Sequence, residues 1–302
     1  MTLRELLNGG RAQLRDAGIP DPEAALDVDL FTRTILGWDR GRVILESAAA
    51  VPDGLEPTFS SWVDRCARHE PAAYIIGSRE FWGLDFIVSP AVLIPRPETE
   101  YIVEAVLEIL GIDVPDGVPR SGQQASRYPA GAKLRLADIG TGSGCIAVSI
   151  AHDAPGVQVV ATDVSTVALA VARQNAERHG VADRVECVAT SYLEGIEGDF
   201  DIIAANPPYV RELDKPGLGA NVRHEPEVAL FGGRDGLLHL EGVLDTAVQK
   251  LRPHGWLVME IGLGQEDDVI ALASRRPALR LDATRCDLQG IPRTILFQRE
   301  VH

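Results

Sequence analysis

The feature that most constrains the fold is an apolar strand pattern that runs directly into a turn of alternating glycines. Leu134–Ile139 is short and mostly apolar, and Gly140-Thr141-Gly142-Ser143-Gly144 follows it before a helical pattern begins at Cys145. A buried strand that enters a helix through glycines is typical of an α/β sheet with helices on both faces. Ligands in such sheets bind outside the carboxyl ends of the strands, so the glycine turn predicts a binding site at that edge.

Strand and helix patterns alternate through the rest of the chain. We expect helices over 145–151 and 166–179, and strands over 134–139, 157–161, 185–188, 201–205, 256–261 and 293–298. This alternation predicts an α/β fold with a mostly parallel sheet. Gly140, Asp163 and Asn206 each come directly after one of these strands or within two residues of its end, so we expect them along one edge of the sheet.

The first part of the chain has a different pattern of apolar residues. From Leu3 to about Glu70, apolar residues recur with helical spacing, and turns with glycine and proline interrupt them. We expect an N-terminal helical bundle over 1–73 that recognises the substrate, and a linking β-hairpin over 74–92, where aromatic and β-branched residues gather. The second domain then spans 93–302. Within it, 112–133 has several prolines and glycines and predicts a flexible loop.

The composition limits the class of protein. The chain has 302 residues, enough for two domains. It has no apolar span long enough to cross a bilayer and no secretory signal pattern, so we expect a cytoplasmic protein without membrane contact. Its four cysteines are far apart and form no C-x-x-C pair. We expect all four to be reduced and mostly buried, with no metal site and no disulfide.

The net charge weighs against a nucleic-acid substrate. The formal charge is −15, whereas proteins that bind nucleic acid usually carry a basic face that neutralises phosphates. Solubility alone is enough to account for an acidic surface. The charge therefore makes nucleic acid a poor direct substrate, although it does not exclude a local basic patch.

A rigid turn, Asn206-Pro207-Pro208-Tyr209, follows the strand at 201–205. Prolines lack the N–H that continues a ladder, so the strand must stop at Asn206. The Asn206 side-chain oxygen and the Pro207 carbonyl can accept the two N–H groups of a flat NH2, on which Tyr209 can stack. An amide nitrogen is a weak nucleophile that needs orientation more than a strong base. We expect these four residues to be catalytic and to bind substrate, although Asn-Pro also begins many ordinary loops.

The glycine turn predicts a nucleotide-bearing cofactor. Glycine lets the backbone approach a ligand closely, and Asp163 lies about 20 residues further on, at the next strand end, where a carboxylate can hold ribose hydroxyls. The spacing is not G-x-G-x-x-G and no G-K-[ST] follows, which argues against dinucleotides and triphosphates. Asp138, before the turn, suits a cofactor without phosphates. S-adenosylmethionine has none and carries a positive sulfonium, so with the Asn206 turn the sequence indicates a methyltransferase.

The chain resembles, essentially from end to end, the peptide chain release factor N5-glutamine methyltransferase family. The Asn206 turn alone is shared with enzymes that methylate adenine, so the helical first domain and the segment 94–99 are the more specific signs. The resemblance is carried by residues 70–77, 79–83, 93–100, 138–144, 206–209, 224–226, 230–233 and 235–236, and by Asp287, Gly290 and Arg293.

This resemblance implies a Rossmann-like class I methyltransferase sheet, and methyl transfer from S-adenosylmethionine to the glutamine amide in the Gly-Gly-Gln loop of a release factor. Many family members have an acidic residue where Ser191 stands; a serine hydroxyl can still accept a hydrogen bond from the adenine amine, without charge. The implied cofactor contacts are Asp138, Gly140, Thr141, Gly142, Ser143, Gly144, Asp163, Ser191, Tyr192 and Asn206. The implied substrate contacts are Asn206, Pro207, Pro208 and Tyr209, with Arg96 and Glu98 near the pocket.

Three other functions are compatible with parts of the sequence. An enzyme that methylates a glutamine of a ribosomal protein would use the same turn, but the segment 94–100 argues against it. A nucleic-acid adenine N6-methyltransferase would present a similar flat NH2, but it would need phosphate contacts and a base-flipping surface. A binding module without catalysis would have no need of an intact Asn206-Pro207-Pro208-Tyr209 turn.

Overall fold

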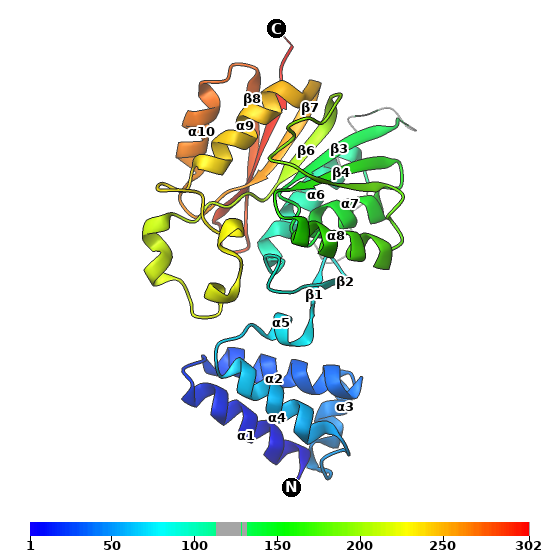
Figure 1. Ribbon diagram of the computed structural model, residues 1–302, viewed down its shortest axis with the longest axis vertical. Helices are drawn as coiled ribbons and strands as arrows, with labels where there is room; N and C mark the ends of the chain where they lie inside the picture. Colours follow the sequence, from blue (N-terminus) through cyan, green and yellow to red (C-terminus); the bar gives the residue numbers. More distant parts are fainter. Residues whose placement is uncertain (113–127, 129–131, 302) are drawn as a thin grey trace. The chain divides into compact units, whose positions relative to one another are not determined.

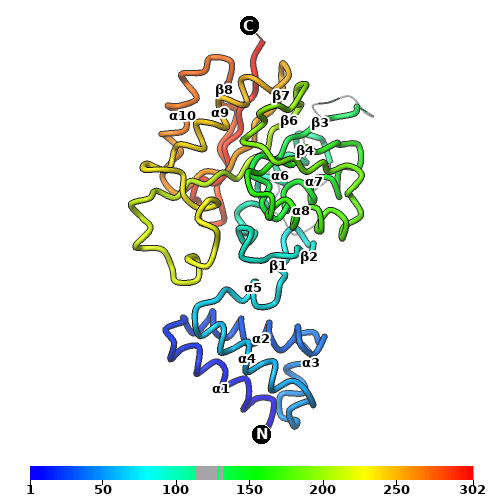
Figure 2. The backbone as a smooth tube through the Cα atoms, viewed as in Figure 1, coloured from blue at the N-terminus to red at the C-terminus, as the bar shows by residue number. Residues whose placement is uncertain are grey.

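The computed structural model describes residues 1–112, 128 and 132–301. They divide into a helical unit, Met1–Ser78 with Gly219–His224, and a sheet unit, Arg79–Leu218 with Glu225–His302. Most of the predicted loop 112–133 lies outside the described residues. Figures 1 and 2 show the two units, coloured from blue at the N-terminus to red at the C-terminus.

The helical unit is the expected bundle of short helices. Its core includes the largest buried side chains of these helices, Leu3, Leu14, Phe31, Leu55 and Phe59. A capping box starts the first helix, because the Thr2 hydroxyl accepts from Glu5 N and the Glu5 carboxylate accepts from Thr2 N. The helices are α1 (Leu3–Asp16), α2 (Asp21–Leu36), α3 (Arg40–Leu45), α4 (Leu55–Cys66) and α5 (Ala72–Ile76), with a 3₁₀ turn η1 (Glu46–Ala48).

The linking hairpin is present but begins later than expected. The strands are β1 (Ser78–Phe81) and β2 (Leu84–Ile87), whereas Tyr74 to Ile76, predicted as part of the hairpin, lie in α5. Ile75 and Ile76 pack against the core of the helical unit, so tertiary burial overrides their preference for strands. Gly77, with φ of 82°, ends the helix.

The sheet unit contains seven strands in the order β5-β4-β3-β6-β7-β9-β8 (Figure 1). The first five in this order are parallel, and β9 runs antiparallel to both β7 and β8. The strands are β3 (Leu134–Ile139), β4 (Val157–Asp163), β5 (Val185–Ala189), β6 (Phe200–Ala205), β7 (Leu251–Glu260), β8 (Leu279–Cys286) and β9 (Pro292–Arg299). The α/β prediction is therefore confirmed.

Two layers of helices cover the sheet, with α6 (Glu100–Leu110), α7 (Cys145–Asp153) and α8 (Thr166–Arg178) on one face. On the other face lie α9 (Leu238–Lys250) and α10 (Glu266–Ser274), as Figure 1 shows. Successive strand residues alternate between the two cores. In β6, Ile202 and Ala204 face the first layer, while Ile203 and Ala205 face the second. All six residues of β6 are buried, as expected of a central strand.

One strand was missed, and the cysteine prediction is partly wrong. β8 is an edge strand with several exposed residues, so it lacks the continuous apolar run that identified the other strands. Cys66 and Cys145 are buried, but Cys187 is half-buried and Cys286, the last residue of β8, is exposed. All four thiols are free. Within residues 1–112, 128 and 132–301, no helix is long and apolar enough to cross a membrane.

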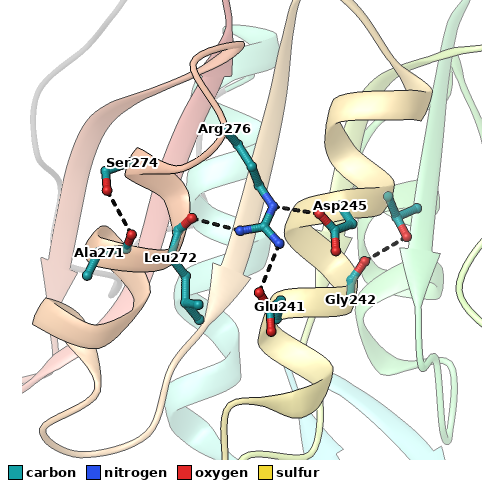
Figure 3. Close-up of polar contacts among 8 residues, drawn as sticks. Glu241, Gly242, Asp245, Ala271, Leu272, Ser274 and Arg276 are labelled. Atoms are coloured by element: carbon teal, nitrogen blue, oxygen red, sulfur yellow. Dashed lines mark hydrogen bonds and ion pairs between the residues drawn. The ribbon is translucent and has the colours of Figure 1, made fainter.

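Arg276 holds the second helix layer together (Figure 3). Its guanidinium donates to Asp245 at 2.7 Å and Glu241 at 3.3 Å, both on α9, and to the Leu272 carbonyl of α10 at 2.7 Å. The hydrogen bond from Arg276 lowers the pKa of Asp245. The position of α9 matters because this helix also lines the pocket described below.

Two adjacent glycines of α1 give a matched test of the helical core. A Cβ at Gly10 would lie 2.8 Å from Phe59 Cζ, whereas a Cβ at the exposed Gly9 would meet nothing within 4 Å. We predict that Gly10→Ala lowers the free energy of unfolding by about 1–3 kcal/mol through overpacking. Gly9→Ala should raise it by about 0.5–1 kcal/mol, since alanine favours helix. Paired urea titrations followed by circular dichroism measure both, and equal stabilities would contradict the packing of Phe59.

Candidate active site

The register of the parallel strands brings four polar positions to one edge of the sheet. Ile139 of β3 pairs with Thr162 of β4 and with Ala205 of β6, and Ala205 pairs with Met259 of β7. The next residues along these strands are therefore Gly140, Asp163, Asn206 and Glu260. The first three were predicted at this edge, and the structure places them there.

A pocket of about 130 Å³ opens at this edge of the sheet unit. Its lining includes Leu93, Pro226 and Val228 from connecting segments, and His239 and Val243 from α9, none of which was predicted as a site residue. The predicted site residues in the lining are Gly140, Gly142, Asp163, Ser191, Tyr192, Asn206, Pro207 and Pro208. Those outside it are Arg96, Glu98, Asp138, Thr141, Ser143, Gly144 and Tyr209.

The glycine turn has the backbone that its composition predicts. Gly140, Gly142 and Gly144 have φ of 73°, 55° and 82°, a region that other residues rarely adopt. A Cβ at Gly140 would meet no atom within 4 Å, so the backbone here is open to a ligand. At Gly144 a Cβ would lie 3.1 Å from Ala172 Cβ, so that glycine serves the packing of α7 on α8.

Asp138 lies beneath the turn, outside the pocket lining. Its side chain is completely buried, and Oδ2 accepts from Thr141 Oγ1 at 2.6 Å and from Ala147 N at 3.2 Å. Its Oδ1 has no hydrogen-bond partner among the described residues. Burial raises the pKa of Asp138 to about 7. The carboxyl group thus holds the glycine turn against the start of α7.

Asp163 joins the glycine turn to the start of α8. Its Oδ2 accepts from Gly142 N at 3.0 Å, and its Oδ1 accepts from Ser165 N at 2.8 Å. The Ser165 hydroxyl in turn caps α8 by accepting from Ala168 N. Since each carboxylate oxygen has further acceptor capacity, Asp163 is held in place with lone pairs left for a ligand.

Tyr192 forms one wall of the pocket and depends on a glycine in α9. Its backbone has φ of 49°, and its hydroxyl lies 3.1 Å from His239 Nδ1. Burial lowers the pKa of His239, which favours the neutral ring that can accept this hydrogen bond. A Cβ at Gly242 would lie 2.3 Å from the Tyr192 hydroxyl oxygen. Gly242 therefore provides the space that the tyrosine occupies.

The side-chain amide of Asn206 is held by a chain of hydrogen bonds. Its Nδ2 donates to Thr99 Oγ1 at 2.9 Å, and Thr99 Oγ1 donates to Glu260 Oε2 at 2.7 Å. Tyr209 Oη donates to the other carboxylate oxygen, Oε1, at 3.0 Å. With its nitrogen engaged, Asn206 can present its Oδ1 as an acceptor. Thr99 and Glu260 were not identified as site residues from the sequence.

The turn after Asn206 is fixed by Gln265 and by glycines. Gln265 Nε2 donates to the carbonyls of Tyr209 at 3.2 Å and Gly236 at 3.3 Å, and its Oε1 accepts from Gly262 N at 2.8 Å. A Cβ at Gly236 would lie 2.4 Å from the Tyr209 carbonyl, and one at Gly232 would lie 2.5 Å from the Pro208 carbonyl. This packing leaves the Tyr209 ring outside the pocket lining, with its hydroxyl on Glu260.

Arg96 has a structural partner near the pocket. Its guanidinium donates to Glu225 Oε1 at 2.5 Å, and Glu225 Oε2 accepts from Ile94 N at 3.2 Å. Glu225 is buried and precedes Pro226, which lines the pocket. Arg96 thus ties two pocket-forming segments together, and Glu98 is half-buried beside them. Asp287, in the turn before β9, and Arg293 of β9, which carried part of the resemblance, pair at 2.9 Å.

Comparisons with known proteins show which family the chain resembles in sequence. Family models described as PrmC N-terminal domain and Methyltransferase small domain match residues 5–77 and 125–225. The chain is 39% identical over 285 residues to a release factor glutamine methyltransferase of Bradyrhizobium diazoefficiens, covering 94% of this chain and 90% of the relative. It is 38% identical over 304 residues to one of Nitratidesulfovibrio vulgaris, covering 99% and 96%.

A solved structure shows the same fold. A methyltransferase from Pyrococcus furiosus aligns with a TM-score of 0.51 and 19% sequence identity, over 79% of this chain and 99% of that one. At this level of identity the likeness concerns the fold alone.

The buried Glu260 carboxyl predicts a specific pH dependence of stability. Burial is the main cause that raises its pKa from an ordinary 4.5 to about 7. The folded state therefore keeps this proton where the unfolded chain has released it, and stability falls as pH rises from about 5 to about 7.

We predict that Glu260→Gln, which cannot ionise, removes about 1–3 kcal/mol of this loss. Urea unfolding of wild type and variant at about pH 5 and about pH 8 measures the difference. The exposed Glu177→Gln is the matched control and should follow the wild type. Parallel pH dependences for Glu260→Gln and the wild type would contradict the prediction.

Proposed function

The chain belongs to the release factor glutamine methyltransferase family, and we propose that it methylates the glutamine of the Gly-Gly-Gln loop in peptide chain release factors. As a member of this family it is an S-adenosylmethionine-dependent protein-glutamine N5-methyltransferase. When bound, S-adenosylmethionine supplies an electrophilic methyl group on a sulfonium. Our proposal concerns the substrate: the methylated glutamine is the one in the Gly-Gly-Gln loop of a release factor.

The observation that best supports this proposal is the anchored amide of Asn206. Its nitrogen is engaged by Thr99, so its oxygen is the group left to meet the substrate at the pocket. That oxygen and the Pro207 carbonyl would each accept one N–H of the glutamine amide. The two hydrogen bonds would orient the nitrogen and stabilise the positive charge that develops as it attacks.

The residues at the other side of the pocket fit the cofactor. The backbone of Gly140 is open where a side chain would stand, and Asp163 keeps acceptor capacity for ribose hydroxyls. We propose that Gly140, Gly142 and Asp163 hold the cofactor, with Ser191 and Tyr192 beside its adenine. Asp138, Thr141, Ser143 and Gly144 would act indirectly by shaping the turn.

Two of the proposed substrate residues receive different roles. The Tyr209 ring is outside the pocket lining, and its hydroxyl donates a hydrogen bond to Glu260. We therefore propose that Tyr209 fixes the turn and does not stack on the glutamine. Arg96 would likewise act through its pair with Glu225, which positions Pro226 in the pocket wall. Glu98 keeps its proposed place near the pocket without an assigned contact.

The alternatives are weaker. A ribosomal-protein glutamine would suit the same turn, but the match to the PrmC N-terminal domain supports a release factor. An adenine in nucleic acid would meet a chain with a net charge of −15, which opposes a polyanion at long range. A cytoplasmic location remains a prediction.

A product assay tests the substrate directly. The full chain and labelled S-adenosylmethionine are incubated in parallel with an intact release factor, the same factor with its Gly-Gly-Gln glutamine replaced, a ribosomal protein and adenine-containing DNA. We expect one methyl group on the release-factor glutamine, located by peptide mass spectrometry, and none on the other three. Methylation of adenine with an unmodified glutamine would overturn the proposal.

Loss of the Asn206 acceptor is predicted to affect turnover more than binding. Asn206→Ala leaves the glycine turn and Asp163 intact, so we expect kcat to fall roughly a hundredfold or more, because an interaction that orients the nucleophile is lost. Affinity for the cofactor should change little, as calorimetry will show. A kcat within a few-fold of the wild type would remove Asn206 from its proposed role.

Loss of Asp163 is predicted to act chiefly on cofactor binding. Asp163→Ala removes the ribose acceptor and also frees the amides of Gly142 and Ser165, so we expect affinity for S-adenosylmethionine to fall roughly tenfold or more. The exposed Asp183→Ala serves as the matched control. Unchanged calorimetric affinity for Asp163→Ala would mean that the cofactor binds elsewhere.

A further inference from the structure

The hydrogen bonds around Glu260 run in one direction. Thr99 and Tyr209 each have one hydroxyl hydrogen, and both donate it to the Glu260 carboxylate. Glu260 and Thr99 are only 1% and 2% exposed, so water does not readily replace these partners. Because Thr99 has given its hydrogen to Glu260, it can only accept from Asn206. The Asn206 amide must therefore turn its NH2 toward Thr99 and its oxygen away.

We propose that the charge of Glu260 sets the orientation of the Asn206 amide through Thr99, so that Asn206 presents an acceptor to the substrate nitrogen only while Glu260 is ionised. Glu260 and Thr99 are then positioning residues, since neither lines the pocket. This inference rests on the proposed role of Asn206 in binding the glutamine amide. It adds Glu260 as the group that decides whether the oxygen or the NH2 of Asn206 faces the substrate.

Protonation of Glu260 reverses the direction of the hydrogen bonds that link Glu260, Thr99 and Asn206. The protonated carboxyl needs an acceptor, and Thr99 Oγ1 is within reach at 2.7 Å. Glu260 then no longer accepts the hydrogen of Thr99, and the Asn206 amide turns over so that its Oδ1 becomes the new acceptor of that hydrogen. The NH2 of Asn206 now faces the N–H groups of the substrate and repels them. Donation to Tyr209 instead would displace the hydrogen bond that Tyr209 Oη donates to Glu260 Oε1.

The charged and titratable groups around Glu260 come from four other elements. Glu98, beside Thr99 in η2 (Pro97–Thr99), raises the pKa of Glu260, and Arg293 of β9 lowers it. Tyr209, after β6, donates to Glu260, and Cys145, at the start of α7, lies within its electrostatic reach. Burial outweighs the hydrogen bonds from Thr99 and Tyr209 and brings the pKa to about 7. The change in charge therefore falls within the pH range of an ordinary assay.

The first test follows kcat on the release-factor glutamine from about pH 6 to about pH 8, with both substrates saturating. For the wild type we expect kcat to fall as pH drops through about 7. Glu260→Gln and Thr99→Val should show no such fall and a plateau roughly tenfold lower, whereas Thr99→Ser, which keeps the hydroxyl, should retain the wild-type profile. A wild-type pH profile in Glu260→Gln or Thr99→Val would overturn the proposal.

The second test asks whether Thr99 acts through Asn206. Thr99→Val should lower kcat roughly tenfold in the wild-type background but by less than about twofold in Asn206→Ala, since no amide remains to orient. The same factor in both backgrounds would make the effect of Thr99 independent of Asn206 and would overturn the proposal.

The third test needs no catalysis. In the free protein with isotopically labelled asparagine, the side-chain amide signal of Asn206 is assigned by its absence in Asn206→Ala. We expect it to shift with a midpoint near pH 7 in the wild type and to stay constant in Glu260→Gln. An Asn206 amide signal whose chemical shift does not change with pH in the wild type would overturn the inference. If the wild type methylates no release factor, the proposed function fails, and this measurement still tests the amide orientation separately.

Discussion

The hydrogen-bonded register of β3, β4, β6 and β7 is the constraint on which the site depends. Parallel strands end at the same edge, and their pairing fixes which residue of each strand stands there. A shift of one residue in β6 would turn its apolar side chains to the opposite faces and move Asn206 out of line with Gly140 and Glu260. Core packing on both faces of β6 forbids that shift. The geometry of the pocket is thus a by-product of burying apolar side chains.

The same burial makes the edge electrostatically sensitive. Asp138 and Glu260 stand at the ends of central strands, where removal from water raises the pKa of both carboxyls to about 7. Each is compensated in part by hydroxyl donors, Thr141 for Asp138 and Thr99 with Tyr209 for Glu260. Burying these two carboxyls therefore lowers the stability of the fold at the candidate site, and such a cost is common at functional positions. Neither carboxyl lines the pocket.

The sequence predicted the parts of the site that depend on local pattern. Buried strands stand out as apolar runs, and glycines or prolines after them mark the strand ends, so Gly140, Asp163 and Asn206 could be placed before the structure was known. The contact of Thr99 with Glu260 could not, because 161 residues separate them and neither belongs to a motif with its own mechanism. Arg96 shows another limit: the resemblance implied a place near the pocket, but not that Arg96 would donate its hydrogen bond to a buried carboxylate 129 residues away.

The fit of Tyr192 into the space beside Gly242 has a consequence for how this pocket can change over evolutionary time. A glycine in the middle of α9 weakens that helix by about 1 kcal/mol relative to alanine, so substitution at Gly242 would be favoured if helix stability alone counted. The tyrosine ring blocks every such substitution while it remains in place. The two positions are therefore linked: a lineage that reshapes the pocket around a smaller residue at 192 is free to gain a side chain at 242, and the two positions should covary.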